Sequence, residues 1–237
     1  MRTPSPCFTG ETLRFLHAMA RHNNRDWFRA RRDQYETHVR GPMIATIERL
    51  ARDFASFAPE LVASPRASLY RVYRDTRFSA DKSPLKTHVA ASFPWRGLPR
   101  HEGAGLYVEL SPSHLLIAGG LYMPQPPALL ALREHIARNA GALRAIEQSA
   151  GFKRAFGRIE GDALKRVPRG FPPDHPAADY LKLRQFLVSR ECPPECATSP
   201  RFYRQLVTLF AQMMPLIRFL NEPLSAQAAW QDPLGLT

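Results

Sequence analysis

The chain has 237 residues, of which 44% are hydrophobic and 23% charged, and it carries a formal net charge of +12. This length allows one large domain or two small ones, and the apolar content suffices for a packed core, which argues against a disordered chain. No stretch approaches the roughly 18 apolar residues of a membrane span, and residues 1–7 lack the apolar core of a signal peptide. The sequence therefore predicts a cytoplasmic protein with no membrane partner.

The positive charge comes mainly from arginine. Of the 33 basic residues 28 are arginine and five are lysine, and they are spread along the whole chain. A charge of this size favours contact with phosphates or acidic surfaces, although an Arg-rich solvated surface or a coding bias toward arginine also accounts for it. Nucleic-acid-binding proteins usually carry a continuous basic face with stacking aromatic residues. Nucleic acid is therefore an alternative partner and not the favoured one.

The sequence offers little support for a metal or a cofactor. Cys192 and Cys196 are the only close pair among three cysteines, and they have no further Cys or His at the spacing of a four-ligand zinc site. In a reducing cytoplasm free thiols are expected. The chain also lacks a Gly-x-Gly-x-x-Gly motif and a Walker loop, so ordinary dinucleotide or NTP binding is not predicted. We expect no metal and no cofactor.

Helices are predicted before residue 60, where apolar residues recur at helical spacing. Thr9 can cap the first helix and Asn24 the second. Residues 41–42, a Gly-Pro pair, are expected to end the second helix and to begin a third that runs to Pro59. The first helix is expected to place three apolar residues on one face, namely Leu13, Leu16 and Ala20, with Phe15 and Met19 beside them.

In the middle of the chain the pattern changes to that of strands. Residues 68–74 and 86–93 are each predicted to be a strand. Residues 106–110 and 114–118 are predicted to form a β-hairpin that turns at Ser111-Pro112-Ser113. We expect the hairpin and residues 69–74 to lie in the same antiparallel sheet.

Helices are predicted again toward the C-terminus, at residues 128–138, 142–149, 177–185 and 199–221, the last kinked at Pro215. Residues 186–188 are a short apolar stretch. The predicted fold class is therefore α+β, with an antiparallel sheet built from the middle of the chain and flanked by N-terminal and C-terminal helices. We expect one domain over residues 8–222 and a tail, residues 223–237, that is poorly ordered except at Trp230.

One polar stretch, residues 69–87, differs from the rest of the chain and is called the central stretch below. Between Arg71 and Lys86 it carries five cations and two carboxylates, spaced neither at the period of a helix nor at that of a strand. A solvated face is usually periodic. An aperiodic mixture of Arg, Asp, Ser and Lys beside aromatic residues is more typical of a polar site held by a folded frame.

The central stretch also suggests a family. Residues 74–87, RDTRFSADKSPLKT, closely resemble the signature of the domain of unknown function 2461 (DUF2461) family, approximately R-D-x-R-F-S-x-D-K-S-P-Y-K-T. Residues 23–28, NNRDWF, and a Pro-rich loop at 164–176, with its KRVPRGF and DHP segments, are further matches. Leu85 stands where the signature has tyrosine. The resemblance implies a single-domain cytoplasmic protein of bacteria or fungi, and it implies no activity and no catalytic residues.

A ligand site in the central stretch would consist of cations that converge on an anion. Arginine offers a two-pronged donor and lysine a point charge, while carboxylates orient them and serine adds a hydroxyl. The residues expected to bind the ligand are Arg74, Asp75, Arg77, Ser79, Asp81, Lys82, Lys86 and, from the Pro-rich loop, Arg169. Arg74 and Arg77 should then point into a partly open cleft, and the three motifs should meet in space.

The alternative is that the charges of the central stretch only stabilise its own conformation as a loop. Asp75 and Asp81 would then pair with neighbouring cations, and Phe78 would anchor the loop in the core. Ser83 would cap a turn at Pro84.

Three functions stay open on the sequence alone. The first is a site, in an enzyme or a binding protein, for a small molecule or nucleotide that carries phosphate or carboxylate. The second is an interaction module without chemistry. The third is a nucleic-acid-binding protein in which Trp95 or Tyr122 stacks on bases. A concave pocket lined by the central stretch would favour the first function over the second.

Overall fold

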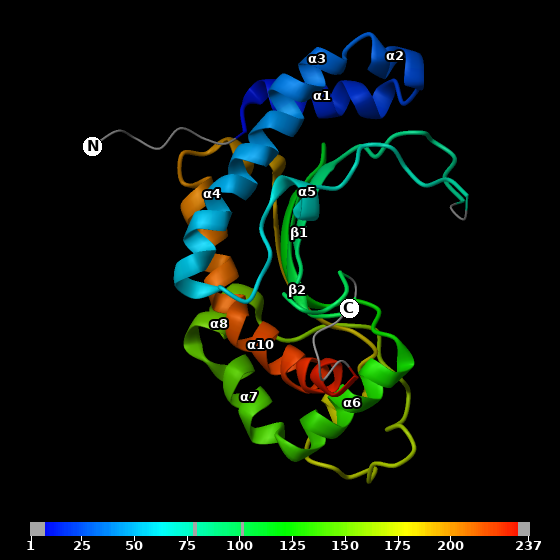
Figure 1. Cartoon of the computed structure of the whole chain (residues 1–237), viewed down its shortest axis with the longest axis vertical. Helices are drawn as coiled ribbons and strands as arrows, with labels where there is room; N and C mark the ends of the chain where they lie inside the picture. Colours follow the sequence, from blue (N-terminus) through cyan, green and yellow to red (C-terminus); the bar gives the residue numbers. More distant parts are fainter. Residues whose placement is uncertain (1–7, 78–79, 101, 232–237) are drawn as a thin grey trace. The chain divides into compact units, whose positions relative to one another are not determined.

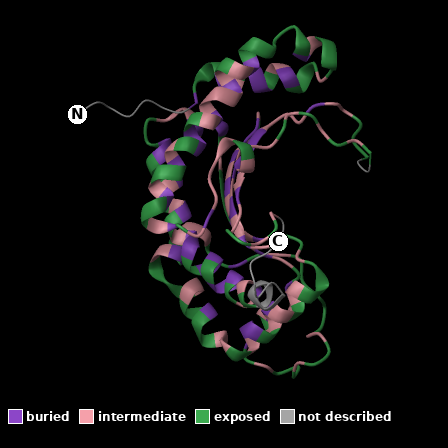
Figure 2. Cartoon of the chain, in the orientation of Figure 1, coloured by how far each residue is buried: buried purple, intermediate pink, exposed green. Residues whose placement is uncertain are grey.

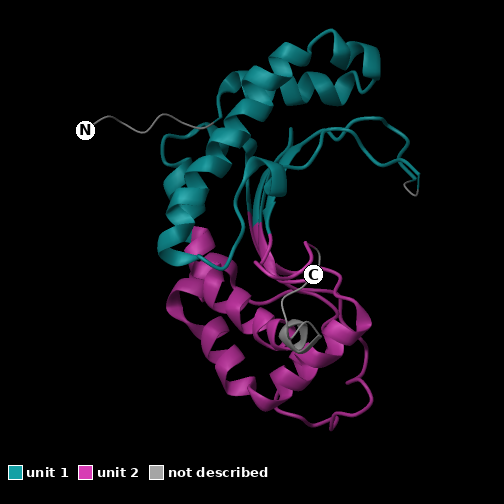
Figure 3. Ribbon diagram, viewed as in Figure 1, with its two compact units in different colours: residues 1–93, 107–117, 191–208 teal, residues 94–106, 118–190, 209–237 magenta. Residues whose placement is uncertain are grey.

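The computed structural model describes residues 8–77, 80–100 and 102–231, with side chains as far as Ala226 (Figure 1). The chain divides into two compact units, each made of several segments (Figure 3). Unit 1 comprises residues 1–93, 107–117 and 191–208, and unit 2 comprises residues 94–106, 118–190 and 209–237. The span predicted as one domain, residues 8–222, therefore contains parts of both units.

Unit 1 begins with helices, two of which start at the predicted capping residues. Their bounds are α1 Gly10–Arg21, α2 Arg25–Arg29, α3 Arg32–Tyr35, a π-helix Glu36–Arg40, α4 Gly41–Phe57 and α5 Pro65–Ser68. As predicted, α1 follows Thr9 and α2 follows Asn24. The Asn24 side chain accepts the Trp27 N–H at 2.8 Å, which satisfies one of the free N–H groups at the start of α2.

The buried face of α1 differs from the predicted one. Leu16 is buried as expected, but Ala20 is exposed and Phe15 takes part in the core. The Phe15 ring packs against those of Trp27 and Tyr35, with centroids 5.6 and 6.0 Å apart. An aromatic ring buries far more apolar area than alanine, so the rings decide which side of α1 faces the core.

The prediction that residues 41–42 end the second helix is wrong, because the helical run continues from α3 through the π-helix into α4. Pro42 has no N–H with which to bond the carbonyl of His38, four residues earlier. That carbonyl instead accepts the Thr12 hydroxyl of α1 at 2.6 Å. A Cβ on Gly41 would lie 2.9 Å from the Glu36 carbonyl oxygen, so the wide π turn needs glycine here.

The sheet is antiparallel, with four strands in the order β1-β2-β3-β4. Its strands are β1 Val89–Phe93, β2 Gly105–Leu110, β3 Leu115–Leu121 and β4 Phe186–Cys192. The predicted hairpin is confirmed, since β2 and β3 are neighbours and the Ser111 N–H donates to the His114 carbonyl at 2.9 Å in the turn. β4 was not predicted as a strand because only residues 186–188 are apolar and the rest of β4 is exposed or half-buried.

Residues 68–74, predicted as a strand of this sheet, do not form one. Ser68 is the last residue of α5, and the extended segment that follows makes isolated antiparallel bridges, Leu69 to Ala91 and Tyr73 to Leu85. The segment therefore runs beside residues 85–91 without a continuous ladder. The prediction of an extended segment antiparallel to its neighbour is correct, and the prediction of a regular strand is wrong.

The two faces of the hairpin in unit 1 differ in burial. On β2, Val108 and Leu110 are buried, while Tyr107 and Glu109 on the other face are half-buried; buried and half-buried residues alternate along the strands in Figure 2. α4 packs against β1, with the rings of Phe54 and Phe93 5.2 Å apart. The half-buried face of the hairpin therefore carries the polar side chains of Tyr107 and Glu109.

Unit 2 holds the remaining helices, namely α6 Pro126–Arg138, α7 Ala140–Gln148, α8 Ala150–Phe156, α9 Ala178–Lys182 and most of α10 Phe202–Gln231. α9 is shorter than the predicted helix at 177–185, because Leu183 is already extended. α10 continues past its predicted end at residue 221 and through Pro223, since proline removes one backbone hydrogen bond without having to end a helix.

Asn221, the residue at which this helix was predicted to end, fixes α10 to another segment of unit 2. Its buried side-chain amide donates to the Ala104 carbonyl at 2.9 Å and accepts the Ala104 N–H at 2.8 Å. The Trp230 side chain and residues 232–237 of the predicted tail lie outside the described residues. None of the helices in the described part of the chain is long and apolar enough to cross a membrane.

Candidate functional site

The central stretch forms a loop in unit 1 whose two ends are tied together. The Arg74 N–H donates to the Pro84 carbonyl at 3.0 Å, and the Lys86 N–H donates to the Val72 carbonyl at 2.8 Å. The bridge between Tyr73 and Leu85 lies between these two bonds. The loop that carries most of the predicted site residues is therefore closed at its base by backbone pairing.

Asp75 and Arg77 pair with each other inside this loop. Arg77 Nη2 lies 2.8 Å from Asp75 Oδ2, and Arg77 Nε lies 3.1 Å from Oδ1, which also accepts the Arg77 N–H at 3.2 Å. These hydrogen bonds lower the pKa of Asp75 to about 2. The pair lies on the surface, with 76% of the Arg77 side chain exposed.

Arg74 and Asp81 make the second pair. Arg74 Nη1 lies 2.9 Å from Asp81 Oδ2, and Arg74 Nη2 donates to the Leu85 carbonyl at 3.4 Å. Asp81 also accepts the Ser83 N–H at 2.9 Å, and its hydrogen bonds with Ser83, followed by the charge of Arg74, lower the Asp81 pKa. Both carboxylates of the loop are thus engaged with groups of the loop itself.

The remaining predicted site residues lie in different surroundings. Lys82 Nζ donates to the Thr76 carbonyl at 2.9 Å, and Lys86 Nζ lies 4.8 Å from the centre of the Tyr70 ring. Ser79 and Phe78 lie outside the described residues. Arg169 belongs to unit 2, so its meeting with the loop of unit 1 stays a prediction. Binding of a ligand by this set also stays a prediction.

The motif at residues 23–28 meets the central stretch. Asn23 Nδ2 donates to the Leu85 carbonyl at 2.9 Å, and Asn23 Oδ1 accepts the Leu85 N–H at 3.0 Å. The Leu85 side chain is fully buried, and Phe28 of the same motif contacts the Tyr73 ring edge-on with centroids 5.9 Å apart. One amide therefore anchors the base of the loop to the end of α1.

A cavity of about 330 Å³ lies in unit 1 beside the first part of the central stretch. It is lined by Phe28, Arg32, Tyr35, Glu36, Arg40, Pro65 and residues 69–73. Arg40 pairs with Glu36 at 2.9 Å, whereas the side chains of Arg32 and Arg71 make no hydrogen bond or ion pair with another described residue. Burial raises the pKa of Tyr35 to about 12, so its phenol stays neutral in the cavity wall.

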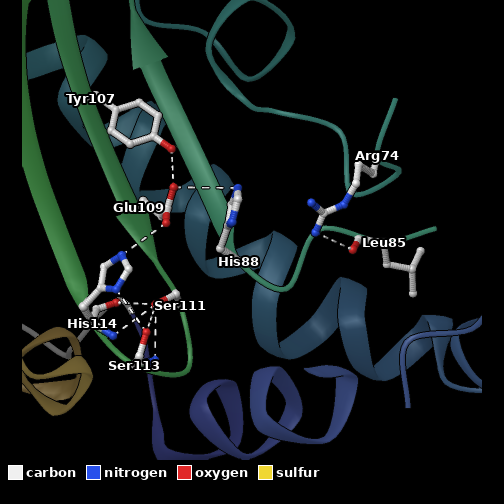
Figure 4. Close-up of polar contacts among 8 residues, drawn as sticks. All are labelled: Arg74, Leu85, His88, Tyr107, Glu109, Ser111, Ser113 and His114. Atoms are coloured by element: carbon white, nitrogen blue, oxygen red, sulfur yellow. Dashed lines mark hydrogen bonds and ion pairs between the residues drawn. The ribbon is translucent and has the colours of Figure 1, made fainter. Parts of the chain in front are cut away.

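A second set of polar residues lies on the half-buried face of the hairpin, and one of them directly follows the central stretch in sequence (Figure 4). Glu109 is its centre, with 14% of its side chain exposed. Tyr107 donates to Glu109 Oε2, His114 Nε2 lies 3.2 Å from Oε1, and His88 Nε2 lies 3.7 Å from Oε2. We call these four residues the Glu109 cluster.

The sequence analysis missed the Glu109 cluster, although part of its signal was present. Tyr107 and Glu109 alternate with apolar residues on β2, which places both on one face. His88 directly follows the family-like signature, and His114 ends the predicted turn. Which strands are neighbours decides whether these side chains meet, and that pairing is not a local property. No group of three or more His, Cys, Asp or Glu in the described residues is arranged to hold a metal ion.

The Glu109 cluster predicts a pH dependence of stability. Burial lowers the pKa of His88 below its ordinary value of 6.5, and the opposing charge of Glu109 offsets this only in part. A histidine with a lowered pKa binds fewer protons in the folded than in the unfolded protein. The free energy of unfolding should therefore rise with pH through the window below 6.5 and fall on acidification.

This dependence can be measured by urea unfolding at several values between about pH 5 and 7. His135 in unit 2 has its pKa lowered in the same direction, again by burial first, so the parent protein is compared with His88→Gln. The variant should show a shallower slope of stability against pH. An unchanged slope would show that His88 does not titrate as its surroundings indicate.

Comparison with known proteins identifies the family. A family model described as "Conserved hypothetical protein (DUF2461)" matches residues 11–219. No curated protein and no solved structure matches the chain. The family match covers both compact units and the whole of the central stretch, and it agrees with the resemblance that residues 74–87 suggest. The chain therefore belongs to the DUF2461 family.

Proposed function

We propose that this protein binds a small molecule bearing a phosphate or carboxylate group in the cavity of unit 1. The observation that carries the proposal is a pair of arginines, Arg32 and Arg71, that line a cavity beside the central stretch and make no hydrogen bond or ion pair with another described residue. Arginine presents several N–H donors in a planar fork that matches an oxyanion. A concave site of this kind was the feature expected to favour a small ligand.

The charge and the shape of the cavity support the same conclusion. Three arginines and one glutamate are among the lining residues, which leaves two positive charges once Arg40 and Glu36 are paired. The rings of Phe28, Tyr35, Tyr70 and Tyr73 supply apolar walls. A volume of about 330 Å³ lies at the lower end of the range for ligand pockets, about 300–1,000 Å³. The fitting ligand class is therefore a small aromatic or ring-bearing anion.

The proposal differs from the predicted set of site residues. Arg71 and Arg32, which were not in that set, contact the ligand, whereas the predicted Arg74 and Arg77 hold the loop through Asp81 and Asp75. The internal pairing of the loop also favours the second function, an interaction module in which the central stretch is a rigid element. A ligand-binding measurement separates the two.

The test is a titration with phenyl phosphate and with benzoate in which calorimetry measures the heat of binding. Binding of either probe to the parent protein is expected. The probe that binds more tightly shows whether the site prefers a phosphate or a carboxylate. Arg71→Ala should lose at least about tenfold in affinity, because a hydrogen bond to a charged group contributes about 1.5–3 kcal/mol. Arg32→Ala should behave similarly.

Arg77→Ala is the matched control, since it removes the same kind of side chain from an exposed position of the same stretch. It should bind phenyl phosphate as the parent does. If Arg77→Ala loses binding and Arg71→Ala keeps it, the ligand lies on the loop and the cavity proposal is wrong. If neither probe binds the parent protein, the interaction module is favoured.

A further inference from the structure

The hairpin turn of unit 1 holds a chain of three side chains in the order serine, histidine, glutamate (Figure 4). Ser113 Oγ lies 3.1 Å from His114 Nδ1, and His114 Nε2 lies 3.2 Å from Glu109 Oε1. Ser113 is exposed, 27% of the His114 side chain is exposed, and Glu109 is largely buried. The hydroxyl is thus open to solvent while the carboxylate behind it is shielded.

The hydrogen bonds around the turn indicate which atom carries each proton. An ionised carboxylate only accepts, so His114 Nε2 carries the hydrogen toward Glu109 and Nδ1 is left as an acceptor. Ser111 Oγ already accepts the N–H groups of Ser113 and His114, at 3.2 and 3.0 Å, and lies 3.1 Å from the His114 carbonyl, to which it donates. Ser111 Oγ therefore has no lone pair left to accept the Ser113 hydroxyl. The Ser113 hydroxyl is directed to His114 Nδ1 instead.

Glu109 is itself held in place from two other sides. Tyr107 donates to its Oε2, and His88 lies beside the same oxygen at 3.7 Å. A carboxylate fixed in this way holds the imidazole in one tautomer and stabilises the imidazolium that forms when a proton is taken up. Such support goes beyond what a hairpin turn needs for its own stability.

We infer that Ser113 is a nucleophile, that His114 is its general base, and that Glu109 positions His114. With an ester, Ser113 Oγ bonds to the acyl carbon while its proton passes to His114 Nδ1. The bond from the acyl carbon to the leaving oxygen then breaks, and that oxygen takes the proton from Nδ1. Water repeats the sequence on the acyl-serine, so that ester and water give acid and alcohol.

The substrate class follows from what the turn lacks. The N–H groups of Ser113 and His114 both donate to Ser111, so among the described residues neither is free to bind an oxyanion. Loss of one oxyanion donor costs about 10²–10³-fold in rate, whereas a positioned general base contributes about 10²–10⁴-fold. The site should therefore act on activated acyl or sulfonyl groups with good leaving groups, and not on amides.

The test uses phenylmethanesulfonyl fluoride on the full-length protein. Ser113 Oγ should bond to the sulfur, the sulfur–fluorine bond breaks, and the proton passes to His114. Intact mass and peptide mapping should find one adduct, on Ser113, and none in Ser113→Ala. Ser56 is an internal control, because it is also exposed but donates to the Asp53 carbonyl and makes no hydrogen bond with a described histidine.

Further variants separate catalysis from a structural role. His114→Gln should be labelled at least about 100-fold more slowly. Glu109→Gln should slow the labelling of Ser113, and Glu109→Asp, which keeps an anionic acceptor for His114, should restore part of the rate. Circular dichroism and thermal melting confirm that each variant is folded.

Three results would each overturn the inference. One is a folded parent protein without an adduct on Ser113 at about pH 8. Another is labelling of folded His114→Gln at the parent rate. The third is labelling of Ser56 as fast as Ser113.

Discussion

Replacing Gly120 with alanine is expected to lower the free energy of unfolding of unit 2 by about 2–6 kcal/mol. Gly120 has φ +136°, a conformation that costs other residues about 1–3 kcal/mol. A Cβ there would overlap the Phe186 carbonyl oxygen and lie 2.9 Å from Leu187 Cα. Because backbone cannot move aside as a side chain can, β3 and β4 would separate locally, at a further cost of about 1–3 kcal/mol.

Urea unfolding and hydrogen exchange of the amides in β4 would measure this effect. Gly141→Ala is the control, because Gly141 lies within α7 and a Cβ there meets nothing within 4 Å. That change should stabilise the protein by about 0.4–1 kcal/mol. If Gly120→Ala is as stable as the parent, the close approach of the two strands is wrong.

Replacing Asn23 with alanine is expected to lower the free energy of unfolding by about 2–3 kcal/mol. The Leu85 N–H loses its partner at 3.0 Å, and the Leu85 carbonyl keeps only the Arg74 guanidinium at 3.4 Å. An unsatisfied buried polar group costs about 1–3 kcal/mol. The loss should be local first, since this amide joins two segments 62 residues apart.

Hydrogen exchange of the Leu85 amide reports this directly, because it should be protected in the parent and exchange freely in Asn23→Ala. Asn24→Ala is the matched control. Asn24 is exposed and caps α2, and its loss should cost about 1 kcal/mol without changing exchange at Leu85. Equal melting of the two variants, with Leu85 still protected, would contradict the anchoring role of Asn23.

Tyr70 connects the cavity of unit 1 with the Glu109 cluster. Tyr70 lines the cavity, and its ring contacts that of Tyr107, a member of the cluster, edge-on with centroids 6.2 Å apart. Lys86 Nζ lies 4.8 Å from the centre of the same ring. One residue of the central stretch therefore lies between the two polar sites.

Much of the fold was determined by local sequence. Thr9 and Asn24 mark helix starts through short-range bonds, because the Thr9 N–H donates to the Thr12 hydroxyl and the Asn24 side chain accepts the Trp27 N–H, and that signal lies within a few residues. The hairpin of β2 and β3 was predicted from alternation around Ser111-Pro112-Ser113, since strand period and turn chemistry are also local. The family was recognised from residues 74–87 for the same reason, because a motif is a contiguous string.

Only the tertiary structure decided which polar residues meet. β4 became a strand because β3 offers it an edge, not because its own residues alternate. Asn23 meets Leu85, and His88 meets Glu109, across chain separations at which periodicity carries no information. Of the predicted cations, Arg74 and Arg77 pair with Asp81 and Asp75, because charges close in sequence pair at little entropic cost, whereas the residues that line the cavity include Arg32 and Arg71.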